Sequence, residues 1–156
     1  YPEVIDYSSS SHVASNLRFE LCSAQKISSL CELFHSRKVV VFSLGSLQYC
    51  QPEHLPDFYS MLVHSPAKSL DVLILEPGNE LEGNPDGLHK SLWRGSFGYT
   101  NDYRYYAENA GLTTVVSEII RPDVPYEEFP SYRRGTIHYW LWSKVTSPEK
   151  AQMFTS

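Results

Sequence analysis

Two unbroken apolar runs are the strongest pattern along the chain. Residues 38–42 read Lys-Val-Val-Val-Phe and residues 71–75 read Asp-Val-Leu-Ile-Leu, and neither run alternates apolar with polar positions. Strands of this kind are typical of parallel sheets that are covered on both faces. We therefore predict two buried parallel strands, with the strand at 38–42 in the centre of its sheet.

Helical patterns surround these two strands. Apolar side chains recur at positions i, i+3, i+4 and i+7 between residues 25 and 35, which predicts an amphipathic helix there. A second helix should begin after Gln51, with a proline in its first turn. A third should follow Thr100 or Asn101, either of which can cap it, and should end near Gly111. This alternation of strand and helix indicates parallel strands joined by right-handed crossovers.

The C-terminal third of the chain predicts two further strands. Residues 112–120 and 136–145 are rich in branched and aromatic side chains, and a Pro-rich segment, 121–130, separates them. At 156 residues the chain is long enough for one hydrophobic core but not for two. We predict one α/β domain over residues 1–145, followed by a tail, 146–156, that has little to bury.

One long segment lacks any apolar period. It runs from Glu76 to Gly98 and contains five glycines. Long loops at the carboxyl ends of parallel strands often carry function. We interpret residues 81–99 as a mobile lid, with glycines as flexible points and an apolar surface that includes Trp93. The alternative is a packed surface segment in which Trp93 is permanently buried.

Composition and charge narrow the possible partners. The net charge of −5 works against affinity for nucleic acid, because such affinity depends on clustered Lys and Arg. No stretch approaches the roughly 20 consecutive apolar residues that span a bilayer, so no membrane partner is expected. The three cysteines, Cys22, Cys31 and Cys50, have neither disulfide nor zinc spacing and indicate buried thiols. We expect a cytoplasmic protein without a metal site.

Six segments together indicate a family. They are residues 4–8, 17–24, 39–49, 73–78, 103–112 and 135–145. In order and spacing five of them resemble the second, third, fourth, fifth and seventh strands of the class I S-adenosylmethionine-dependent methyltransferases, whose strand order is 3-2-1-4-5-7-6, and residues 103–112 resemble the late helix that runs into the sixth strand. The resemblance implies a Rossmann-like α/β fold, with a mainly parallel twisted sheet and an antiparallel strand near the C-terminus. The family's first strand and its Gly-rich turn have no counterpart here. We therefore expect either part of a longer protein or a rebuilt sheet, with another chain or an upstream segment as the partner that completes it.

The resemblance also implies S-adenosylmethionine as the cofactor. The positions that it assigns to the cofactor are Asp6, Ser23, Ala24, Ser43, Leu44 and Gly45. Asp6 matches the carboxylate that accepts hydrogen bonds from the ribose hydroxyls, and Ser23 stands where the family usually has an Asp beside the adenine. The loop that contains Gly45 matches the loop near the methionine part of the cofactor. Two alternatives stay open, namely Asp6 as a helix cap or turn residue and Gly45 as the glycine of a tight turn.

A second set of residues is expected to face the methyl acceptor. Its members are Tyr49, Glu76, Trp93, Tyr99, Tyr103 and Arg104. Aromatic rings can form a wall for an acceptor, and a phenol hydroxyl can donate to it. Alternatively, Glu76 bonds only to local backbone amides and the tyrosines are packing residues of a helix. His89 is the candidate catalytic base, because imidazole titrates near neutrality and this residue lies in the long loop. The alternative is a solvated loop histidine.

The leading hypothesis is methyl transfer from S-adenosylmethionine to an oxygen or nitrogen of a small-molecule acceptor. Holding the two reactants at near-attack distance would supply most of the catalysis, without a metal. The competing hypothesis is a non-catalytic methyltransferase-like or partial domain that acts as a binding or scaffold module with another chain. Fold-level resemblance alone does not fix function, so another nucleotide-binding α/β protein is a third possibility.

Overall fold

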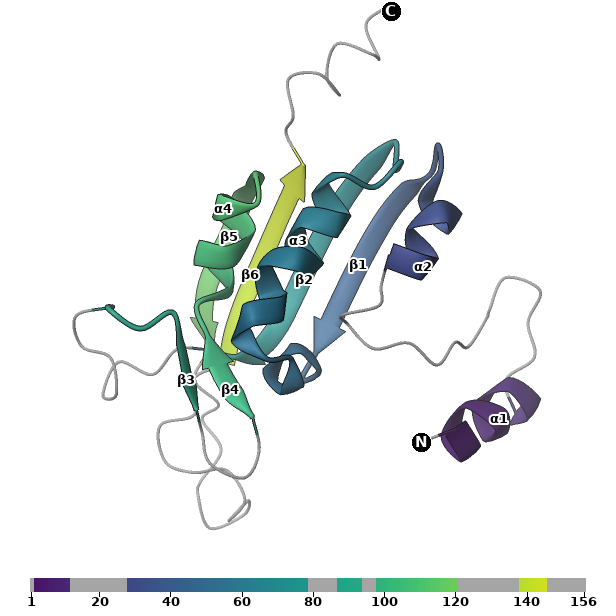
Figure 1. Ribbon diagram of the computed structural model, residues 1–156, viewed down its shortest axis with the longest axis horizontal. Helices are drawn as coiled ribbons and strands as arrows, with labels where there is room; N and C mark the ends of the chain where they lie inside the picture. The colour runs from purple at the N-terminus through teal and green to yellow at the C-terminus, as the bar shows by residue number, and fades with distance from the viewer. Residues whose placement is uncertain (1, 12–27, 79–86, 94–97, 121–137, 146–156) are drawn as a thin grey trace, which may run out of the picture.

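The computed structural model describes residues 2–11, 28–78, 87–93, 98–120 and 138–145. Four strands form the main sheet, in the order β1-β2-β6-β5 (Figure 1). Their bounds are Lys38–Leu44 for β1, Ser69–Pro77 for β2, Leu112–Ile120 for β5 and His138–Val145 for β6. Two short strands, β3 (Ser91–Trp93) and β4 (Tyr99–Asn101), form a second sheet.

The pairing of the four strands follows the expected order. β1 and β2 are parallel, whereas β6 is antiparallel to both of its neighbours, β2 and β5. This is the order 4-5-7-6 within the strand order of the class I methyltransferases, with β6 in the place of the antiparallel seventh strand. The prediction of a Rossmann-like α/β fold with an antiparallel C-terminal strand is confirmed.

Three helical segments pack on one face of the sheet. α2 (Ser28–Cys31) continues as η2 (Glu32–Phe34), η4 (Pro52–His54) leads into α3 (Leu55–Val63), and α4 (Tyr103–Asn109) precedes β5. Figure 1 shows α2, α3 and α4 in front of the same face. The first two predicted helices are thus confirmed where the structure describes them.

The hydrophobic core lies between these helices and the sheet. α3 buries Leu55, Phe58 and Leu62, which are spaced along one helical face, in a single cluster with Val72 and Ile74 of β2. Each fully buried side chain of this size contributes roughly 1.5–3 kcal/mol. This cluster holds the parallel strands in register and so fixes where they end.

The start of α4 differs from the prediction. Thr100 and Asn101, predicted as caps, belong to β4, where pairing with β3 holds their backbone extended. The N-cap is Asp102, whose carboxylate accepts a hydrogen bond from the Tyr105 backbone N–H at 3.0 Å. Gly111 follows the helix with a φ of +98°, as its predicted position requires.

The N-terminal segment also differs from the prediction. α1 (Pro2–Ser11) is a helix over residues 4–8, so the predicted second strand is wrong. A proline favours the first turn of a helix, and two consecutive apolar residues are too few to specify a strand. Figure 1 shows α1 apart from the sheet. The strand predicted over residues 17–24 lies outside the described residues.

β1 was predicted to be a central strand, but it is an edge strand of the described sheet. Among the described strands it pairs with β2 alone. Val39 and Val41 pack against the helix-side core, but Val40, Phe42 and Leu44 on the opposite face are 63%, 56% and 60% exposed. The run is apolar on both faces, yet in the described part of the chain helices cover only one.

Candidate functional site

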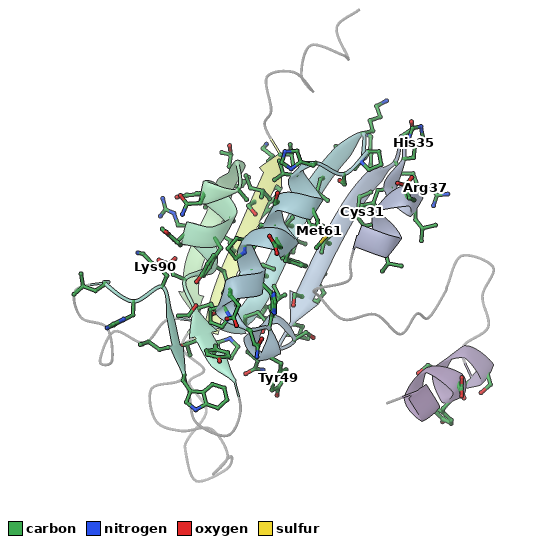
Figure 2. All side chains as sticks on the ribbon, in the orientation of Figure 1. Cys31, His35, Arg37, Tyr49, Met61 and Lys90 are labelled. Atoms are coloured by element: carbon green, nitrogen blue, oxygen red, sulfur yellow. The ribbon has the colours of Figure 1, made fainter. Side chains whose placement is uncertain are left out.

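The carboxyl ends of β1 and β2 meet at one edge of the sheet. The turn after β1, residues 45–49, includes the short helix η3 (Leu47–Tyr49), and β4 contacts η3. Asn101 of β4 forms a β-bridge with Gly78, directly after β2. Figure 1 shows β3 and β4 at this end of the sheet, and Figure 2 shows Tyr49 at the same end. Because ligands bind outside the carboxyl ends of strands in doubly wound sheets, this edge is the candidate site.

Gly45 makes the turn that ends β1. Its φ of +64° is a left-handed conformation that favours glycine. Its N–H donates to the Leu75 carbonyl at 3.1 Å, and its own carbonyl accepts from the Gln48 side-chain amide at 2.8 Å. A Cβ at Gly45 would lie 3.5 Å from the Gln48 Nε2, which is an ordinary contact. The turn, and not crowding, therefore requires the glycine.

Glu76 is fully buried beneath this turn. One carboxylate oxygen accepts from the Ser43 hydroxyl at 2.5 Å, and from the backbone N–H groups of Ser46 and Leu47 at 2.7 and 2.9 Å. The other oxygen accepts from the Gln48 N–H at 3.3 Å. All four donors belong to the end of β1 and its turn. The structure thus places Glu76 under the site, where it fixes the loop, and not on a surface that faces an acceptor.

The two residues before Gly45 face opposite sides of β1. Ser43 is 8% exposed and gives its hydroxyl to Glu76, whereas Leu44 is 60% exposed on the uncovered face of the sheet. Alternation along a strand explains the difference. Of these three residues assigned to the cofactor, only Leu44 therefore presents an exposed side chain at the edge.

Three of the residues assigned to the acceptor lie together. Trp93 and Tyr99 are direct cross-strand partners, with ring centroids 4.9 Å apart and planes at 63°. The backbone of Gly98, directly before Tyr99, lies against the turn that carries Tyr49: a Cβ on Gly98 would collide with the Gln48 carbonyl oxygen and lie 3.4 Å from the Tyr49 ring. Tyr49 and Trp93 are 63% and 62% exposed. We call the rings of Tyr49, Trp93 and Tyr99 the aromatic platform.

Tyr103 has a packing role. It is fully buried in the core, at the start of α4. The Asn101 side-chain amide donates to its hydroxyl at 3.1 Å, and the Asn101 carbonyl oxygen accepts from the Ser91 hydroxyl at 2.6 Å. The Ser91 hydroxyl also bonds to that of Tyr106 at 3.0 Å. These hydrogen bonds join β3, β4 and α4, so Tyr103 supports the platform's strands without lining its surface.

Arg104 lies on the exposed side of α4. Its Nε donates to Glu108 at 2.8 Å, one helical turn later. The hydrogen bond from Arg104 lowers the pKa of Glu108, and a hydrogen bond from Thr114 lowers it to a smaller extent. The contact is an ordinary i,i+4 ion pair of a helix surface. A role for Arg104 at the acceptor stays a prediction.

The predicted lid is partly a β-hairpin. Its described residues form β3 and the start of β4, and Trp93 within it is exposed. The structure thus differs from the alternative in which Trp93 is permanently buried. His89 is exposed in the segment before β3, and its role as a base stays a prediction.

Asp6 does not lie at the end of a strand. It is exposed on α1, so the geometric basis for assigning it to the ribose hydroxyls is wrong. The error follows from reading residues 4–8 as a strand. Ser23 and Ala24 lie outside the described residues.

Sequence reasoning missed the residues that build the support of the site. Gly98 was counted as a flexible point, although a glycine directly before an aromatic strand residue is a signal of close backbone approach. Asn101 was considered only as a cap. No local pattern marks Ser46, Leu47 and Gln48, because their part is played by main-chain N–H groups.

Other kinds of site have little basis in the described residues. No three His, Cys, Asp or Glu side chains there are grouped as a metal ion requires. None of the described helices is both long and apolar enough to cross a bilayer. Cys31 and Cys50 are buried, and this burial raises the pKa of both thiols.

Solved structures of methyltransferases share this fold. A 1,6-didemethyltoxoflavin-N1-methyltransferase from Burkholderia thailandensis, with bound 1,6-didemethyltoxoflavin and S-adenosylhomocysteine, is 14% identical, with a TM-score of 0.58 over 94% of this chain and 57% of its own. An S-adenosylmethionine-dependent methyltransferase from Methanosarcina mazei is 8% identical, with a TM-score of 0.59 over 93% of this chain and 78% of its own. A putative methyltransferase from Haloferax volcanii, in complex with the Trm112 methyltransferase activator, is 16% identical, with a TM-score of 0.58 over 92% of this chain and 69% of its own. The sequence matches no protein-family model and no curated protein.

The chain therefore has the fold of the class I S-adenosylmethionine-dependent methyltransferases. Likeness at 8% to 16% identity shows the fold. The chain spans 57% of the length of the Burkholderia thailandensis protein.

Proposed function

We propose that this chain binds S-adenosylmethionine at the carboxyl edge of β1 and β2 and takes part in methyl transfer to an oxygen or nitrogen of a small-molecule acceptor. The observation that carries the proposal is the turn after β1, which Glu76 ties to the end of β2 through three backbone N–H groups. This turn lies where the resemblance puts the methionine part of the cofactor. The shared fold supports the proposal, as does the S-adenosylhomocysteine bound to the Burkholderia thailandensis protein.

The described residues fit one part of the cofactor. Gly45 is half-buried and Ser46 is exposed at the edge, and Leu44 adds an exposed apolar side chain. The ribose hydroxyls call for a carboxylate, but Glu76 is buried under the turn and Asp6 lies on α1. We therefore assign the ribose side of the site to residues outside the described ranges, from this chain or from another, beside the edge of β1 that no described strand pairs.

The cofactor supplies an electrophilic methyl group on a sulfonium. The chain's own part is positional: the turn held by Glu76 fixes one side of the site, and the aromatic platform offers a surface for the acceptor on the other. Orientation of this kind accounts for roughly 7–11 kcal/mol in the most favourable intramolecular reactions. Where the acceptor must lose a proton, the exposed imidazole of His89 is the proposed base. No specific observation favours the scaffold alternative.

Titration of the ¹⁵N-labelled chain with S-adenosylhomocysteine tests this proposal. We expect saturable amide shifts concentrated at residues 43–49, with a dissociation constant at or below about 1 mM. Gly45→Ala should weaken binding, because alanine is strained at a φ of +64°.

Gly87→Ala is the matched control, since Gly87 has a φ of +63° and open space around it. This variant should bind like the parent chain. An absence of shifts at millimolar ligand, or equal weakening by both substitutions, would contradict the proposed site.

A further inference from the structure

The aromatic platform leaves two large rings in contact with water. Trp93 is 62% exposed and Tyr49 is 63% exposed, so more than half of each large side chain can be covered by a ligand. Single exposed apolar residues are common, whereas a group of them marks a binding surface. The platform is therefore a candidate ligand site in its own right.

The platform is held in place by backbone contacts and not only by its own rings. The main chain of Gly98 packs against Gln48. A Cβ added at Gly98 would lie 3.4 Å from the Tyr49 ring. The hydrogen bonds of Asn101 with Ser91 and Tyr103 tie both strands of the hairpin to α4. Rings fixed in this way lose little conformational entropy when a ligand covers them.

Two of the charged side chains near this edge already have partners. Glu76, the carboxylate at the end of β2, is buried and bonded to the turn. Lys90, just before β3, pairs with Asp102 at 3.3 Å and lies 4.8 Å above the ring of Tyr105. An ionic ligand would find no partner in these groups, whereas a flat uncharged ring could lie against an exposed ring of the platform at no such cost.

We propose that the aromatic platform binds a planar, uncharged aromatic ring system, and that the methyl acceptor of this chain is such a compound. The second half of this statement rests on the proposed function, because it takes the platform to be the acceptor side of the same edge. The first half, binding of the ring, requires neither cofactor nor methyl transfer.

Two ligands with the same carbon skeleton test the proposal. 2-Naphthol is planar and aromatic, whereas decahydro-2-naphthol has the same hydroxyl on a puckered, saturated skeleton. We expect 2-naphthol to bind about tenfold more tightly and to shift the indole N–H resonance of Trp93, assigned with a Trp93→Phe variant. Equal affinities, or shifts that leave Trp93 unchanged, would overturn it. So would a preference for a quaternary ammonium such as phenyltrimethylammonium over 2-naphthol.

Substitutions locate the site by ligand-observed titration. Trp93→Leu and Tyr49→Leu should each weaken 2-naphthol binding about fivefold or more, because leucine keeps apolar bulk and removes the ring. Tyr105→Leu is the matched control, since Tyr105 is also exposed and also forms an edge-to-face pair, with Tyr106. Weakening by Tyr105→Leu to the same extent would contradict the assignment.

The cofactor titration separates the two proposals. Trp93→Leu should leave binding of S-adenosylhomocysteine unchanged. If the ring binds and the nucleoside does not, the platform stands while the proposed methyl transfer fails. If the nucleoside binds and the ring does not, the planar acceptor is wrong and the cofactor site stands.

Discussion

Glu76 shows how one side chain can fix a loop on a neighbouring strand. Its buried carboxylate takes hydrogen bonds from Ser43 and from three consecutive backbone N–H groups of the turn after β1. Burying a carboxylate is costly unless such donors compensate it. The arrangement therefore makes the shape of the turn depend on a residue that lies 29 positions from Leu47.

Replacing this carboxylate should destabilise the chain. In Glu76→Gln the amide NH₂ would face either the Gln48 N–H or the three donors Ser43, Ser46 and Leu47, so at least one backbone N–H loses its acceptor. We expect a loss of about 1–3 kcal/mol in the free energy of unfolding, measured by urea denaturation. Unchanged stability would mean that the turn does not depend on Glu76.

Glu108→Gln is the control for this substitution. Glu108 pairs with Arg104 on an exposed helix face, where such a pair is worth about 0.5 kcal/mol or less. Because these hydrogen bonds lower its pKa in the folded state, its small contribution is present above the unfolded pKa. That contribution is lost as the pH falls through the folded pKa. The effect of Glu108→Gln should therefore fade in acid.

The two described cysteines should be poorly reactive. Burial raises the pKa of Cys31 and of Cys50, and the nearby carboxylates of Glu32 and Glu53 raise them further. In a Cys22→Ser variant at pH 8, we expect both thiols to react with iodoacetamide several-fold more slowly in the native chain than in urea. Because the pKa of both thiols is raised, the reaction rate of the native chain should continue to rise with pH above the pKa of an ordinary thiol. A fast native reaction at either position would show an accessible thiolate.

At the scale of elements, the exposed face of β1 is the feature that most affects behaviour in solution. Val40, Phe42 and Leu44 present a row of apolar side chains beside the backbone edge of the same strand that no described strand pairs. Open strand edges and grouped apolar side chains both favour association between copies. In the proposed function this face and edge receive the segment that completes the sheet.

A charge on this face should reduce self-association. We expect Phe42→Lys to lower the sedimentation coefficient at high protein concentration towards that of a monomer, because the ammonium would have to be desolvated in any contact. Leu88→Lys is the control, since Leu88 is 77% exposed in the segment before β3. If both variants associate like the parent chain, the β1 face is not the contact surface.

At the scale of the whole molecule, the described strands form only part of the sheet of the class I methyltransferase fold. The strands present are those in the order 4-5-7-6, and the chain spans 57% of the Burkholderia thailandensis protein. The Gly-rich turn whose N–H groups would meet the cofactor's methionine carboxylate has no counterpart in the sequence. A ribose-binding carboxylate is also missing from the described residues at the edge.

The chain as given should therefore bind S-adenosylmethionine weakly. We expect isothermal titration calorimetry to give a dissociation constant above roughly 10 μM, which corresponds to about −7 kcal/mol. Tighter binding would show that other residues replace the lost turn. We also expect that adding a segment with the family's first strand and Gly-rich turn strengthens binding of S-adenosylmethionine.

The sequence by itself determined the elements whose signal is local. The apolar runs at β1 and β2, the apolar face of α3 and the glycine that ends α4 depend on side chains within one segment, and they were predicted correctly. The order and spacing of these elements also sufficed to indicate the fold. Residues 4–8 failed because two apolar residues do not distinguish a strand from a helix without knowledge of a partner.

Only the tertiary structure decided how the site is built. Glu76 and its turn meet because parallel pairing of β1 and β2 brings their carboxyl ends together, and the donors are backbone groups that carry no mark in the sequence. The aromatic platform likewise forms because Gly98 allows β4 to approach Gln48, a contact between segments 50 residues apart. Whether an aromatic or acidic side chain lines a site or supports it from beneath depends on which face of its strand is covered by other elements. That choice is made by packing between distant segments and not by local sequence.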